Sequence, residues 1–108
     1  MKKTKIHLLY FEGCPNVKIA RENLRKAIST TGLSPEQWEE IDIEHPETYK
    51  GWKGFPSPTI LVNGFNIEDG EKYAEGTGSC RLGGAPSVEM ILKGLELYEK
   101  KSNDKIVR

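Results

Sequence analysis

Two cysteines are the residues of this sequence best suited to covalent chemistry. One is Cys14, in the segment GCPN (13–16), and the other is Cys80, in the segment GSCR (78–81). Two cysteines are too few for a disulfide scaffold, and they lack the paired CxxC spacing of a structural zinc site. Because a thiolate can attack disulfides, we interpret both as reactive groups. The alternative is that each is a small buried hydrophobic residue.

The residues that follow Cys14 indicate where its thiol lies. Pro15 has no N–H group and is therefore tolerated at the first position of a helix. A helix is expected to begin at or next to Cys14. Unpaired N–H groups and the macrodipole at the start of a helix favour a negative charge, and thus the thiolate of Cys14.

Three elements position this residue. Residues 5–11 form a continuous apolar run that is short enough for a central strand. Residues 15–31 carry apolar side chains at helical spacing, and Gly32 is expected to end this helix. Residues 38–43 alternate apolar with polar, as in a half-buried strand. Strand, helix and strand in this order predict a right-handed crossover with parallel strands.

The second half of the chain predicts a hairpin and a final helix. In order, the sequence indicates a short helix within 46–54, a strand at 59–62, an Asn63-Gly64 turn, a returning strand at 65–67, a long surface loop at 68–84 and a helix over 86–100. The predicted fold class is therefore α/β, with the order β-α-β-α-β-β-α.

Length and charge limit the function classes. The 108 residues suit one domain, expected over 1–101, with a flexible tail at 102–108. Sixteen basic and sixteen acidic residues give no net charge, so we expect no nucleic-acid partner. No apolar stretch is long enough to span a membrane, and the apolar run after the basic start lacks a cleavage site. We expect a cytoplasmic location, where thiols are mostly reduced.

Two segments resemble a known superfamily. The segment YFEGCPN (10–16) is similar to the active-site turn of thioredoxins and glutaredoxins, and PSPTILVNG (56–64) is similar to their cis-proline loop and the hairpin after it. The resemblance covers nearly the whole chain and implies a four-stranded mixed sheet flanked by helices. More narrowly, GCPN and GSCR resemble a small prokaryotic thioredoxin-like group, in which some members carry selenocysteine at this position and some are labelled as related to alkylmercury lyase.

This resemblance implies a thiol-disulfide oxidoreductase. Cys14 would be the nucleophile, and a cis Pro58 would bring the backbone beside Ser57 to the thiol; an ordinary trans proline is the alternative. The substrate-binding candidates that follow from the resemblance are Pro15, Asn16, Ser57, Pro58, Thr59 and Arg81. The substrate would be a protein or a small thiol or disulfide, with no cofactor, and the protein would be a monomer or a weak dimer.

The chain departs from the superfamily at the second cysteine. A CxxC motif would place it at position 17, which is valine. Two mechanisms stay open: exchange with an external thiol such as glutathione, or resolution by Cys80. The topology favours Cys80 as a candidate, because the predicted fourth strand ends at the same edge as Cys14. Arg81 would favour a thiolate at Cys80 by charge attraction, although a structural Cys14–Cys80 disulfide is also open.

A second function class is a non-catalytic module that binds a soft metal, such as mercury or copper, or a protein partner through its thiols. No third cysteine supports a metal site. His7 lies within the first predicted strand, where a packed histidine is expected, and His45 before Pro46 is expected in a surface turn. We expect Trp52 and Phe55 in the core, although both are near enough to Pro58 in sequence to flank a groove.

Overall fold

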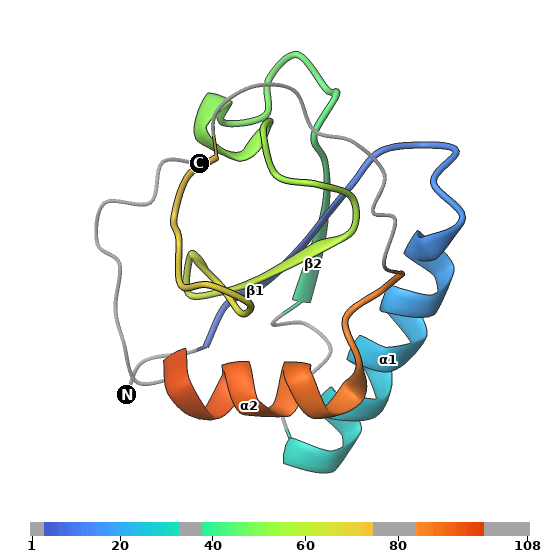
Figure 1. Ribbon diagram of the computed structural model, residues 1–108, viewed down its shortest axis with the longest axis vertical. Helices are drawn as coiled ribbons and strands as arrows, with labels where there is room; N and C mark the ends of the chain where they lie inside the picture. Colours follow the sequence, from blue (N-terminus) through green and yellow to red (C-terminus); the bar gives the residue numbers. More distant parts are fainter. Residues whose placement is uncertain (1–3, 33–37, 75–83, 99–108) are drawn as a thin grey trace.

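The computed structural model describes residues 4–32, 38–74 and 84–98 (Figure 1). Its elements, in chain order, are β1 (Ile6–Tyr10), α1 (Asn16–Thr31), β2 (Trp38–Asp42), the 3-10 helix η2 (Lys50–Trp52), β3 (Thr59–Val62), β4 (Phe65–Asn66) and α2 (Val88–Tyr98). The strands form one sheet in the order β2-β1-β3-β4. β1 pairs parallel with β2 and antiparallel with β3, and β3 pairs antiparallel with β4. The prediction of an α/β fold with a four-stranded mixed sheet is confirmed.

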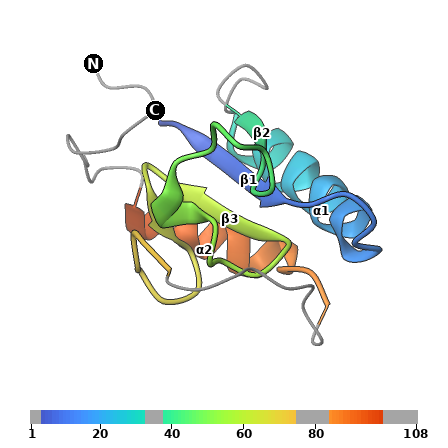
Figure 2. The same ribbon diagram turned by 90° about the horizontal axis from the view of Figure 1, so that it is seen from above.

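Both α-helices cover the same face of the sheet. Ile6 and Leu8 of β1 and Ile60 of β3 point to this face and pack in one buried cluster with Leu24 of α1 and Leu95 of α2. In Figure 2, α1 and α2 lie along one side of the strands. The helical spacing of apolar residues predicted from the sequence therefore marks the faces that the helices bury.

The opposite face is covered by the segment between β2 and β3. Leu9 of β1 and Leu61 of β3 form a second buried cluster with Ile43, Trp52 and Phe55. Because successive side chains of a strand point to opposite faces, β1 contributes to both clusters, and its residues from Ile6 to Leu9 are all buried. The prediction that Trp52 and Phe55 belong to the core is confirmed.

The turns agree with their residue types. Asn63 and Gly64, between β3 and β4, have φ values of 53° and 89°, as the predicted tight hairpin requires. Gly32 is the C-cap of α1 and has a φ of 79°, where a side chain would be strained. Pro15 is the N-cap of α1, one position before the first helical residue.

Two expectations need correction. The short helix expected within 46–54 is only the three-residue η2, because the chain from Asp42 to Phe55 folds as successive turns closed by hydrogen bonds between residues three apart. The returning strand ends at Asn66, because its carbonyl oxygen accepts the N–H of Gly70 and the chain turns. Of the expected loop at 68–84, residues 75–83 lie outside the described residues, as does the tail at 102–108. No helix within the described ranges is long and apolar enough to cross a membrane.

Candidate functional site

Cys14 lies two positions before α1, at the end of the sheet where β1 ends. Its side chain is buried, with 7 % of the residue exposed. The sulfur lies 3.5 Å from the carbonyl oxygen of Ser57, which is 43 residues further along the chain. The site is therefore built from two segments, the turn after β1 and the loop before β3.

The antiparallel pairing of β1 and β3 explains why these segments meet. Leu9 is opposite Thr59 in this pair, so the residues that follow β1 lie beside those that precede β3. The N–H of Phe11 donates a hydrogen bond of 3.3 Å to the hydroxyl oxygen of Ser57. This bond fixes the two segments against each other next to Cys14.

The loop before β3 has the conformation that the resemblance implies. The peptide bond between Ser57 and Pro58 is cis. The hydroxyl of Thr59 donates a hydrogen bond to the carbonyl oxygen of Pro56. Ser57, Pro58 and Thr59 are all buried, whereas Pro15 is exposed and Asn16 is half-buried. A substrate that approaches Cys14 would thus meet Pro15 and Asn16 before the residues of this loop.

The start of α1 presents positive partial charges near Cys14. The helix is 16 residues long and carries no acidic residue in its first turn. Pro15 makes no side-chain hydrogen bond as the N-cap, so no cap side chain neutralises the first N–H groups. The macrodipole of this helix stabilises an anion at its N-terminus. Among the expected site residues, Cys14 therefore lies next to the positive end of this helix.

Two of the expected site residues, Cys80 and Arg81, lie outside the described residues. Cys14, the cysteine within the described residues, is not a free thiol. Of the remaining expected site residues, the structure brings together Cys14, Ser57 and Pro58. Pro15, Asn16 and Thr59 lie in the same two segments. The pairing of Cys14 with Cys80 stays a prediction.

The two histidines have the environments expected from the sequence. His7 is buried in β1, where its ring centre lies 5.0 Å from that of Trp52 and its Nε2 lies 3.5 Å from a carboxylate oxygen of Glu39. His45 is exposed in the turn after β2, and its Nδ1 accepts the N–H of Glu47. Within the described ranges, no group of three or more His, Cys, Asp or Glu side chains is arranged to hold a metal ion.

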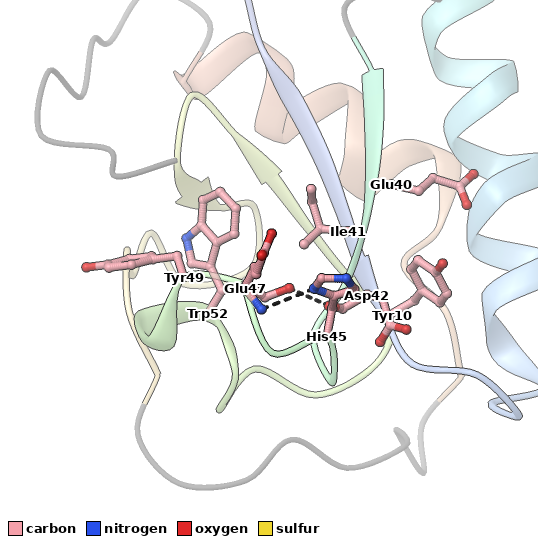
Figure 3. Close-up of a pocket in the computed structure, with 9 residues that line it drawn as sticks. Tyr10, Glu40, Ile41, Asp42, His45, Glu47, Tyr49 and Trp52 are labelled. Atoms are coloured by element: carbon pink, nitrogen blue, oxygen red, sulfur yellow. Dashed lines mark hydrogen bonds between the residues drawn. The ribbon is translucent and has the colours of Figure 1, made fainter.

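A hollow that the sequence did not predict lies at the end of β2, which is an edge strand (Figure 3). Its volume is about 430 Å³, and its lining residues are Tyr10, Glu40, Ile41, Asp42, His45, Glu47, Thr48, Tyr49 and Trp52. Figure 3 shows Tyr49 and Trp52 on one side of Ile41, with Tyr10 and Glu40 on the other. The only sequence signal was the mixture of aromatic and acidic residues at 44–52, which does not reveal that Tyr10 joins them.

Charge around Tyr10 is predominantly negative. Burial raises the pKa of Tyr10 above its ordinary value, and the carboxylates of Asp42, Glu12 and Glu40 raise it further, while Arg21 opposes them. Arg21 of α1 forms a two-pronged ion pair with Glu40, with N–O distances of 2.8 and 2.9 Å. Among the charged groups, the carboxylate of Asp42 therefore has the largest effect on the pKa of Tyr10.

Comparisons of the chain with models of protein families, with curated proteins and with solved structures found no match.

Proposed function

We propose that this protein is a thiol-disulfide oxidoreductase with a thioredoxin-like fold. The sheet order β2-β1-β3-β4 and the two helices on one face are compatible with that fold. The observation that carries the proposal is the position of Cys14, which lies at the start of α1 with its sulfur 3.5 Å from the carbonyl of Ser57, next to cis Pro58. A helix N-terminus suits a thiolate nucleophile.

The reaction would proceed by two exchange steps. The thiolate of Cys14 attacks one sulfur of a substrate disulfide, a mixed disulfide forms on Cys14, and the other substrate sulfur leaves as a thiolate. The thiolate of Cys80 then attacks the Cys14 sulfur, which releases the second substrate thiolate and leaves a Cys14–Cys80 disulfide. The substrate gains two electrons and the protein loses two, so an external thiol pair must reduce the protein before the next turnover.

Substrate access sets a condition on this mechanism. Because Cys14 is only 7 % exposed, a protein disulfide needs a movement of the residues around it to reach the sulfur. Small disulfides or low-molecular-weight thiols need a smaller movement. The setting we propose is a reducing compartment such as the cytoplasm, where external thiols are available.

A single-turnover assay tests the roles of the two cysteines. The reduced protein is mixed with a symmetric aromatic disulfide whose thiolate product is coloured. The native protein is expected to release two thiolates per molecule. Cys80→Ser is expected to release one and to retain the other half on Cys14, and Cys14→Ser is expected to release none in the same time.

Two results would contradict the proposal. Rapid release by Cys14→Ser would show that Cys14 is not the nucleophile. Release of two thiolates by Cys80→Ser would show that Cys80 does not resolve the mixed disulfide. Ser29→Ala, an exposed change on α1 away from both cysteines, serves as the control and is expected to match the native protein.

A further inference from the structure

The hollow at the end of β2 and the Cys14 site share no residues. None of its lining residues is among those around Cys14, although Tyr10 is the last residue of β1 and Cys14 follows four positions later. Its volume of about 430 Å³ lies within the range of small-molecule sites. The backbone here is held by a hydrogen bond of 2.8 Å from the N–H of Ile43 to the carbonyl of Tyr10.

The lining combines aromatic surface with uncompensated negative charge. Glu40 is neutralised by Arg21. In the part of the chain that the structure describes, no cation forms an ion pair with Asp42 or Glu47. Neither Lys nor Arg lines the hollow. A ligand that enters it therefore meets a field that favours a cation.

The groups near the hollow do not remove this field. Lys53 donates hydrogen bonds to the carbonyl oxygens of Ile43 and His45, and it does not line the hollow. His45 accepts the N–H of Glu47 at Nδ1, so this nitrogen directs a lone pair at the backbone. The raised pKa of Tyr10, to which Asp42 contributes, agrees with a net negative environment.

We propose that this hollow binds a guanidinium group. Its aromatic walls include the half-buried rings of Tyr10 and Tyr49, which can stack against a planar cation, while Asp42 and Glu47 supply the opposite charge. A guanidinium is more weakly hydrated than an ammonium and stacks on aromatic rings, so it suits this mixture of walls better than a lysine-type cation. The site does not depend on the role of Cys14.

The test uses nuclear magnetic resonance titration of the isotope-labelled full chain at low ionic strength. The probes are N-acetyl-arginine amide and the uncharged isostere N-acetyl-citrulline amide. We expect the arginine probe to shift the amide signals of residues 40–52 in a saturable way. The citrulline probe is expected to bind at least about tenfold more weakly, because it lacks the charge-assisted contacts.

Matched variants locate the site. Asp42→Asn keeps the oxygen that accepts the N–H of Glu44 and removes only the charge. Together with Glu47→Gln it is expected to weaken arginine binding by about tenfold or more, as the loss of two charged contacts implies. Glu44→Gln removes an equal charge from the same turn but does not line the hollow, so it is expected to change the affinity by less than about twofold.

Further probes distinguish the source of the guanidinium. If ethylguanidinium binds as tightly as the capped peptide Gly-Arg-Gly, the site takes a free guanidinium compound. If the peptide binds more tightly, the site takes an arginine side chain of a polypeptide. Equal binding of the arginine and citrulline probes, shifts confined to residues away from the hollow, or an equal loss in Glu44→Gln would overturn the proposal.

Discussion

The sulfur of Cys14 lies 3.5 Å from the carbonyl oxygen of Ser57, and the hydroxyl of Ser57 accepts the N–H of Phe11. One serine therefore connects the turn that carries the cysteine to the loop before β3 through both its backbone and its side chain. This arrangement follows from the antiparallel pairing of β1 with β3, which brings the two segments to the same end of these central strands.

Ser57→Ala tests the side-chain part of this connection. The change leaves the partly buried N–H of Phe11 without its acceptor, and we expect it to lower the free energy of unfolding by about 1–3 kcal/mol. Urea denaturation measures the change. Ser29→Ala, on the exposed side of α1, is the control and is expected to stay within about 0.5 kcal/mol of the native protein. Equal effects in the two variants would show that the Ser57 bond contributes nothing.

Gly94 is a position where packing outweighs helix propensity. A Cβ atom at Gly94 of α2 would lie 2.4 Å from Cγ2 and 2.5 Å from Cβ of Ile67. Alanine favours a helix over glycine by about 0.5–1 kcal/mol, but overpacking costs about 1–3 kcal/mol. We expect Gly94→Ala to lower the melting temperature.

The same position allows a double-mutant cycle. In Gly94→Ala with Ile67→Gly, position 67 loses both Cβ and Cγ2 and leaves room for the added methyl group, so the double variant is expected to lose less stability than the sum of the two single changes. Additive losses would mean that the destabilisation by Gly94→Ala does not come from Ile67. Lys93→Ala, exposed on the same helix, is the reference for a neutral change.

Asn63 connects the hairpin turn to both ends of the described chain. Its side chain accepts the N–H of Lys5 at 2.9 Å and donates to the carbonyl of Tyr98 at 2.9 Å, and its φ is 53°. Asn63→Gly keeps the backbone conformation and removes the two bonds, at about 1 kcal/mol each. Asn63→Ala adds a penalty of about 1–2 kcal/mol for the left-handed conformation. Chemical denaturation should thus rank the native protein first, the glycine variant second and the alanine variant last; equal stability of the two variants would contradict this order.

The raised pKa of Tyr10 predicts a loss of stability in alkali. Burial and then the charge of Asp42 hold this pKa above its ordinary value of 10.0. Above pH 10.0 the unfolded chain loses this proton before the folded protein does, so the free energy of unfolding falls as the pH rises toward the pKa of the folded state.

Tyr10→Phe should reduce this fall, as measured by denaturation at several alkaline pH values. Tyr49→Phe is the comparison, because burial and Tyr73 raise the pKa of Tyr49 as well. A fall that is unchanged in Tyr10→Phe would contradict the contribution of Tyr10.

Local patterns in the sequence predicted most of the fold. The apolar run that became β1, the helical spacing of α1 and the Asn63-Gly64 turn each depend on neighbouring residues, so they can be recognised in sequence. The extent of β4 depends on tertiary structure, because Ile67 lies beyond the strand and packs close to Gly94 of α2, although its N–H still bonds to the carbonyl oxygen of Ile60. No periodic pattern of apolar residues in the sequence predicts the contact between Ile67 and Gly94.

Cys14 and the hollow at the end of β2 also differ in whether the sequence alone predicts them. Cys14 could be found from its residue type and from the proline that follows it. The hollow could not be found, because it depends on the register that places Tyr10 of β1 opposite Asp42 of β2 and on the series of turns after Asp42. Register is set by the packing of both faces of the sheet and not by any one segment.

The most direct test of the central claim is the intact mass of the protein, alkylated under denaturing conditions, before and after a mild stoichiometric oxidant and again after reduction. If Cys14 and Cys80 form a redox pair, oxidation will remove two hydrogens and block both thiols from alkylation, without dimers, and reduction will restore both. If both thiols still take up the alkylating agent after oxidation, or if added glutathione caps Cys14 alone, the two-cysteine mechanism is contradicted.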